Sequence, residues 1–222
     1  MARSERVTGV TVIIWTSVAL SIALWVLASR DIRWVSFFAL HPDSIASGEH
    51  IQTLVTHIFV HATLLHLFVN MFVLSNLGPL CERIVGRRMF LRFYLFAGIW
   101  AGALSAALSL AFGRGWGERV FGGPEIYLLG GSGAIFAIAG FFVVVLPRLR
   151  FSIIFLPFWA FPAYIMVPVV LLATWAFSIV GDFPIGNAAH AGGFLAGLVF
   201  GLYAKRQFRG RIQWIESLAR RR

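Results

Sequence analysis

The sequence predicts an all-α membrane protein whose core is a six-transmembrane-helix bundle. Of its 222 residues, 59% are hydrophobic and only 13% are charged, whereas soluble domains carry about 25% charged residues. The charges gather in short clusters. The apolar stretches between these clusters are long enough to cross a bilayer core about 30 Å thick. We therefore expect a single membrane domain over residues 1–222.

Six apolar stretches are expected to form the spanning helices. The first resembles a signal peptide because it follows Arg3 and Arg6, but it is long for such a segment and is expected to be retained. After the last stretch we expect only a short basic tail, residues 205–222. The predicted spans are residues 8–29, 57–80, 90–112, 131–147, 161–180 and 188–204.

Basic residues predict the orientation, since cytoplasmic loops are enriched in Lys and Arg. If both termini are cytoplasmic, fifteen of the nineteen Lys and Arg residues lie inside. Only four then lie outside, namely Arg30, Arg33, Arg114 and Arg119. This distribution also accounts for the formal charge of +10 without a nucleic-acid partner, which would require a basic face on a soluble module.

Three polar side chains are expected at one level in the bilayer, where such residues are costly and usually functional. Ser132, His190 and His66 lie 15 or 16 residues from the charged inner ends of their helices, which corresponds to roughly 22–24 Å of helix. A site at this level is submerged but lies near the outer face.

Ser132 lies between glycines at the start of the fourth predicted span. Gly131 and Gly133 permit close approach of a substrate backbone, and the free N–H groups of a helix start suit an oxyanion. A glycine–serine–glycine sequence is also common as a small-residue packing face. That alternative remains open for this segment taken alone.

His190 begins a stripe of small residues on the sixth span. Gly193, Gly197 and Gly201 follow it on one helical face, and such a stripe lets another helix pack closely. Packing this face against that of Ser132 and Phe136 would join a nucleophile to a base. The alternative for a lone histidine is a structural hydrogen bond.

The predicted second span carries further histidines and one asparagine. His66 and Asn70 share a face and are suitable donors to an oxyanion. His57 and His61 have the spacing of metal ligands, but Ile58 stands where a zinc protease motif has glutamate. We expect no metal or other cofactor, and a structural role for both histidines.

These residues together resemble the rhomboid intramembrane serine proteases. The resemblance rests on three motifs in order along nearly the whole chain, His61-x₄-His66-x₃-Asn70, Gly130-x-Ser132-Gly133 and His190-x₂-Gly193-x₃-Gly197. It implies that Ser132 is the nucleophile and His190 the general base, with no third acid. It further implies an oxyanion hole made by the Ser132 backbone N–H and the side chains of His66 and Asn70.

Other positions match the family less evenly. Glu82 and Gly86 resemble its acid and glycine after the second helix, and we expect both to be structural. The Trp-Arg pair typical of the first loop is missing near Gln52-Thr53, which leaves the anchoring of that loop open. Phe136 stands where many members have tyrosine, and it can stack on the base without donating a hydrogen bond.

The predicted activity is hydrolysis of peptide bonds in transmembrane protein substrates within the lipid bilayer. The resemblance also admits a non-catalytic rhomboid-like protein that binds membrane clients, although this chain keeps both serine and histidine. A small transporter is a third possibility, but the paired repeats of that class are not found. We expect the fifth span to move aside for substrate, and a prokaryotic plasma membrane, since no transit peptide is recognised.

Overall fold

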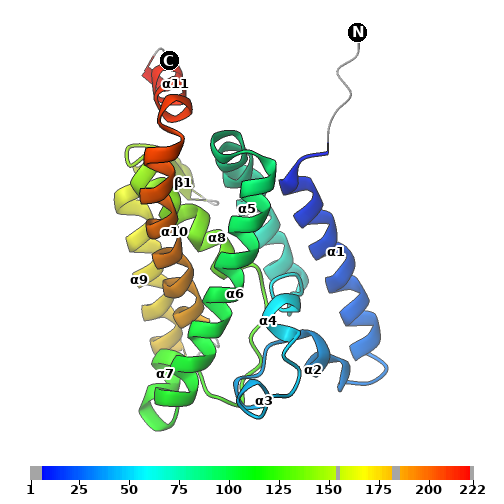
Figure 1. The fold of residues 1–222 in the computed structure, drawn as a ribbon. Coiled ribbons are helices and arrows are strands. Elements are labelled where there is room, and N and C mark those ends of the chain that lie inside the picture. Colours follow the sequence, from blue (N-terminus) through cyan, green and yellow to red (C-terminus); the bar gives the residue numbers. More distant parts are fainter. Residues whose placement is uncertain (1–6, 154–155, 182–185, 221–222) are drawn as a thin grey trace.

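The computed structural model describes residues 7–153, 156–181 and 186–220. The fold is a bundle of long helices, with α8 enclosed by its neighbours near the centre of the view (Figure 1). The start of α1 and the end of α10 lie at the same end of this bundle (Figure 1). The long elements are α1 (Gly9–Ala28), α5 (Leu64–Val85), α6 (Arg87–Phe112), α8 (Ser132–Val145), α9 (Ala163–Gly181) and α10 (Asn187–Gln207).

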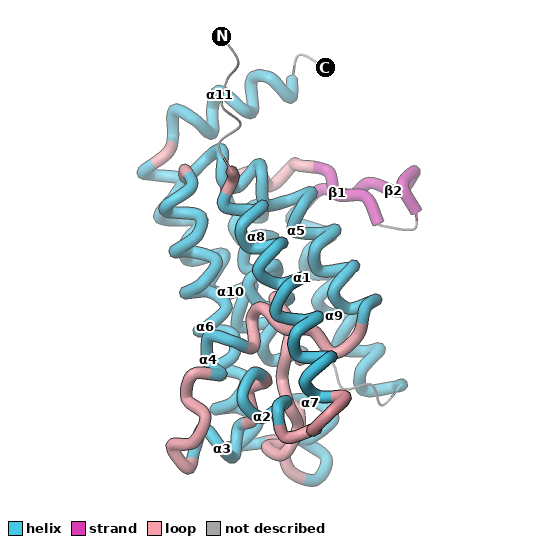
Figure 2. Tube along the Cα trace, turned by 90° about the vertical axis from the view of Figure 1, so that its right-hand side faces the viewer, coloured by secondary structure: helices cyan, strands magenta, loops and turns pink. Residues whose placement is uncertain are grey.

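Short elements lie at the two ends of the bundle. Four of them lie at the end away from the start of α1 (Figure 1), and the 3₁₀ turn η1 (Gly115–Gly117) leads directly into the last of the four. These four are α2 (Trp34–Phe38), α3 (Pro42–Ala46), α4 (Thr53–Thr56) and α7 (Glu118–Phe121). An antiparallel hairpin of β1 (Arg150–Ile153) and β2 (Leu156–Pro162) projects sideways at the other end, and α11 (Arg209–Arg220) crosses that end (Figure 2).

Within the described residues, four helices are long and apolar enough to cross a membrane: α1, α5, α6 and α9. Helix α8 is also apolar but has only 14 residues. It is the most enclosed of the long helices, because ten of its residues are buried by neighbours. The chain is thus a mostly helical, multi-pass membrane protein.

One predicted helix boundary was wrong. The helix expected at 57–80 begins at Leu64, because Thr63 caps it by accepting a hydrogen bond from the His66 N–H at 3.1 Å. His57 and His61 therefore precede α5, and the helical spacing assumed for them does not apply. The segment that leads into the fifth predicted span forms a hairpin, and the basic tail is helical as far as residue 220; the sequence analysis predicted neither feature.

Glu82 joins the first two long helices. Its carboxylate accepts hydrogen bonds from the backbone N–H groups of Gly9 at 2.8 Å and Val10 at 3.0 Å. These N–H groups belong to the first turn of α1, where a negative charge is favourable. Gly86 then separates α5 from α6 with φ of +86°, a conformation that favours glycine. Both residues act structurally here.

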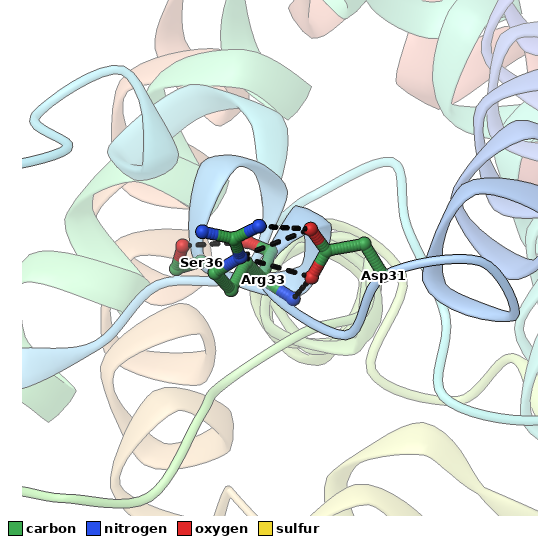
Figure 3. A network of polar contacts seen from close by, with 3 residues as sticks. All are labelled: Asp31, Arg33 and Ser36. Atoms are coloured by element: carbon green, nitrogen blue, oxygen red, sulfur yellow. Dashed lines mark hydrogen bonds and ion pairs between the residues drawn. The ribbon is translucent and has the colours of Figure 1, made fainter.

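The first loop has no Trp-Arg pair near Gln52-Thr53, and an antiparallel bridge between Leu40 and Leu128 holds it to the loop before α8. Thr53 is fully buried and donates its hydroxyl to the His50 carbonyl at 2.6 Å, while Gln52 lies at the surface. At the start of α2, Arg33 and Asp31 form an ion pair at 2.7 Å (Figure 3). The Arg33 side chain, as hydrogen-bond donor, lowers the pKa of the Asp31 carboxyl.

Candidate active site

Ser132 and His190 meet inside the bundle. Ser132 is the first residue of α8, and His190 lies in the first turn of α10. The His190 Nε2 atom lies 2.8 Å from the Ser132 Oγ atom, within hydrogen-bond distance. His190 is buried, so this contact is largely shielded from bulk water. A serine hydroxyl held against an imidazole nitrogen is the arrangement that activates a nucleophile.

Glycines bring the two helices into backbone contact. A Cβ added to Gly193 would overlap the Gly133 carbonyl oxygen, and one on Gly197 would overlap that of Ala137. On α8, a Cβ on Gly140 would likewise overlap the Phe194 carbonyl oxygen. Only glycine permits this approach, and the approach in turn allows two short polar side chains to touch across the interface.

Phe136 supports the histidine ring. It lies one turn after Ser132, and its ring stacks on that of His190 with centroids 4.5 Å apart and planes 26° apart. The buried His190 Nδ1 atom has no hydrogen-bond partner among the described residues. Among the described residues, the imidazole is therefore oriented by stacking and by Ser132, and no carboxylate there contacts it.

The other side of Ser132 is formed by His66 and the preceding glycines. Gly130 has φ of +119°, and a Cβ there would lie 2.7 Å from the His66 ring. The ring thus lies against the chain two residues before the serine. Asn70 is also buried, and its amide donates to the His66 carbonyl at 2.9 Å. No described acceptor takes the Ser132 N–H, as expected at a helix start.

His61 connects α1 to the loop that carries the nucleophile. It is fully buried, and its Nε2 atom accepts a long hydrogen bond of 3.5 Å from the Gly131 N–H. Its Nδ1 atom lies 3.2 Å from the Ser21 hydroxyl, and its carbonyl accepts from the Trp25 indole at 2.8 Å. The His61 ring also meets the edge of His66, with centroids 5.1 Å apart.

His57 holds the same loop through its backbone. Its carbonyl oxygen accepts from the Gly130 N–H at 2.9 Å, while its Nδ1–H donates to the Thr53 carbonyl at 2.7 Å. Neither histidine is grouped with other ligands, since the described residues contain no cluster of three His, Cys, Asp or Glu side chains suited to a metal. Both hold the Gly-rich loop in place.

Sequence reasoning missed Ser21 and Trp25, because α1 carries no ionisable group. The available signal was the pair Ser17 and Ser21, one turn apart in an otherwise apolar stretch, and both are fully buried in the structure. A hydroxyl in a spanning helix usually has a partner on another element. In this chain Ser21 has one, whereas the Ser17 hydroxyl has none among the described residues.

A cleft lies between α6, α7 and the loop before α8, and its described lining includes neither Ser132 nor His190. Its volume is about 590 Å³, and its wall includes Leu128, Ser105 and Gly186. Gly186 accepts a hydrogen bond from the His190 N–H at 3.0 Å, so the cleft reaches the turn that carries the histidine.

The fold and the site define a multi-pass membrane protein with a serine–histidine pair enclosed by its helices. The sequence model of the Rhomboid domain matches residues 48–207, which include both members of the pair. The chain belongs to the rhomboid family, as its three motifs indicated.

Curated relatives come from mitochondria and from bacteria. The chain is 30% identical over 185 residues to the mitochondrial presenilin-associated rhomboid-like protein of Mus musculus, covering 83% of this chain and 46% of that protein. The Homo sapiens protein is 31% identical over 180 residues, covering 81% and 44%. The rhomboid protease GlpG of Yersinia pestis (strain Pestoides F) is 26% identical over 187 residues, covering 84% and 60%. The chain therefore spans less than half the length of the mitochondrial relatives.

Proposed function

We propose that this protein is an intramembrane serine endopeptidase that uses Ser132 as nucleophile and His190 as general base. The observation that carries the proposal is the 2.8 Å contact between His190 Nε2 and Ser132 Oγ in a buried, membrane-embedded bundle. Family membership supports it, and one relative is named a protease.

In the proposed reaction, Ser132 Oγ attacks a substrate carbonyl carbon while His190 Nε2 takes the hydroxyl proton. The resulting oxyanion is stabilised by the Ser132 N–H with His66 and Asn70. The imidazolium gives its proton to the leaving amine, which leaves an acyl ester on Ser132. Water then attacks the ester, with His190 acting as base again. Stacking on Phe136 favours the cationic ring of this cycle.

The substrates are proposed to be transmembrane proteins that enter between helices. Helix α9 is the element proposed to move, since few of its residues are buried and several large apolar side chains face outward, among them Val169, Leu172 and Phe177. The indole of Trp175 ties it to α7 through a hydrogen bond of 2.9 Å to the Val120 carbonyl. The side chains of Phe158 and Trp159, two bulky residues that precede this helix, lie outside the part of the structure that is described.

The membrane arrangement is part of the proposal. Six long helices cross the bilayer as one domain, with both termini in the cytoplasm and the site opening toward the outer face. In Figure 1 the start of α1 and the end of α10 lie at the same end of the bundle, which supports an even number of crossings. We propose a prokaryotic plasma membrane; cell fractionation tests this, and recovery from mitochondria would refute it.

Labelling with a fluorophosphonate tests the function directly. Purified protein should be labelled and should cleave a model transmembrane substrate, and Ser132→Ala should lose both activities. His190→Ala should lose cleavage and most labelling. Ser105→Ala, which removes a buried hydroxyl elsewhere in the bundle, is the control and should keep both. A well-folded wild-type protein that shows neither activity would favour the alternative, a non-catalytic protein that binds membrane clients.

A further inference from the structure

Helix α11 is amphipathic and continues the chain beyond the last long helix. Ile212, Trp214, Ile215 and Leu218 lie on one side of it, and polar residues such as Gln213 occupy the other. A short helix with this division, with Arg on its polar face and Trp and Leu on its apolar face, is typical of segments that lie in the interface of a membrane.

Specific contacts dock α11 against the end of the bundle. Ile212 is 5% exposed, and Ile215 packs against the same core. The Arg211 guanidinium donates to the Ile84 carbonyl at 3.0 Å, in the last turn of α5, and lies over the Phe208 ring. The chain turns sharply after α10, so that α11 crosses the end of the bundle (Figure 2). The helix is thus held in place.

This docking leaves one edge of the apolar side uncovered. Trp214 is 62% exposed and Leu218 is 45% exposed. Both belong to a helix in which Ile212 and Ile215 are used in packing. Helix α11 lies at the end of the bundle where α5 and α10 end and where α6 begins (Figure 1).

Exposed cations lie at the same end of the bundle as this edge. Six exposed cationic side chains lie at the ends of the long helices here: Arg83, Arg87, Arg88, Lys205, Arg206 and Arg209. None of them forms an ion pair within the described ranges. The one ion pair found there joins Arg33 to Asp31, at the opposite end of the bundle. Five of the six are arginines, whose planar fork matches the oxygens of a phosphate group.

We propose that this end of the protein binds the phosphate groups of anionic phospholipids, with Trp214 and Leu218 inserted between the headgroups and the acyl chains. The spanning helices place the basic side chains at headgroup depth, where they are attracted to an anionic leaflet. Indole rings prefer the same depth. The surface adds lipid selection to a protein that its other helices already hold in the bilayer.

Spin labelling tests the depth of α11 in the full-length protein. Cys81 is the only cysteine and is fully buried, so a label should attach only to an introduced cysteine, and unlabelled wild type verifies this. In vesicles of phosphatidylcholine with phosphatidylglycerol, labels at Trp214→Cys and Leu218→Cys should be relaxed more by oxygen than by a water-soluble nickel chelate. Gln213→Cys, on the polar side, should show the reverse. Chelate-accessible labels at all three positions would refute insertion.

A lipid-competition measurement tests the headgroup selection. Spin-labelled phosphatidylglycerol should associate with the wild-type protein more strongly than spin-labelled phosphatidylcholine. The double variant Arg206→Glu, Arg209→Glu should lose this preference, whereas Arg114→Glu, Arg119→Glu at the opposite end should keep it. The proposal fails if wild type shows no preference, or if both double variants lose it equally.

Discussion

At the scale of single residues, Ser21 on α1 is linked through His61 to the residue before the nucleophile. His61 Nε2 accepts from Gly131, so its Nδ1 carries the proton and donates to Ser21, whose hydroxyl donates to the Phe59 carbonyl at 3.3 Å. The chain of contacts ends one residue before Ser132. Ser21 and His61 are positioning residues, since neither contacts the reacting pair.

Replacing Ser21 with alanine should slow the reaction and leave substrate binding intact. The change leaves the buried His61 Nδ1–H without an acceptor, which costs about 1–3 kcal/mol. If the His61 ring shifts as a result, the loop before Ser132 and its oxyanion hole are misplaced. The kcat should then drop about fivefold to a hundredfold, with little change in KM. Ser21→Thr should restore kcat.

Ser17→Ala is the matched control for that measurement, because the buried Ser17 hydroxyl on the same helix has no partner among the described residues. It should leave kcat near the wild-type value. Equal losses in Ser17→Ala and Ser21→Ala would show that α1 acts through its packing and not through His61.

Phe136 should matter through the shape of its ring. Because His190 Nδ1 has no partner among the described residues, stacking does much of the orienting, and an aromatic pair contributes about 0.5–1.5 kcal/mol. Phe136→Leu should therefore lower kcat by roughly twofold to tenfold. Phe136→Tyr keeps the stack and should keep kcat. A Leu variant as active as wild type would contradict this orienting role.

At the scale of helices, the α8–α10 interface decides whether the pair forms. A methyl group on Gly197 would overlap the Ala137 carbonyl, so the helices must separate. Overpacking of this kind costs about 1–3 kcal/mol. We expect Gly197→Ala to lower the midpoint of thermal unfolding in detergent and to reduce fluorophosphonate labelling.

Gly210→Ala provides the control on a helix without such an approach, since a Cβ there meets nothing within 4 Å. It should unfold at the wild-type temperature or slightly above it, because alanine favours helix. If Gly197→Ala behaves in the same way, the close packing of α8 and α10 is not needed for stability.

Helix α9 offers a test of substrate entry. Trp175→Phe removes the indole N–H that holds α9 to the Val120 carbonyl while keeping an aromatic ring. If α9 moves to admit substrate, the variant should cleave a transmembrane substrate faster. Labelling by a small water-soluble fluorophosphonate should be unchanged, because that probe does not enter from lipid. Equal acceleration of cleavage and labelling would indicate an effect on Ser132 itself and not on the entry of substrate past α9.

At the scale of the whole molecule, the two ends of the bundle differ in charge and composition. One carries the basic cluster and α11, and the other carries the first loop and α7 (Figure 1). In intact cells, Arg114→Cys should react with a membrane-impermeant maleimide, whereas Lys205→Cys should react only after lysis. The reverse pattern would invert the proposed topology.

The sequence by itself determined the membrane class, the helical architecture and the residues to examine. Long apolar stretches have no stable alternative in lipid to helices that satisfy their own backbone, and the motifs around Ser132 and His190 stand out against an apolar background. Depth along a helix also follows from counting residues, because the helical rise is constant.

Only the tertiary structure decided which partners each side chain has. The start of α5 at Leu64 depends on the Thr63 cap, and it moves His57 and His61 from the helix into the loop that holds Gly130 and Gly131. The link from Ser21 to His61 and the docking of α11 on Ile84 join segments far apart in the chain. Such contacts depend on which helix faces which, and apolar helices with little amphipathic character carry almost no signal of that choice.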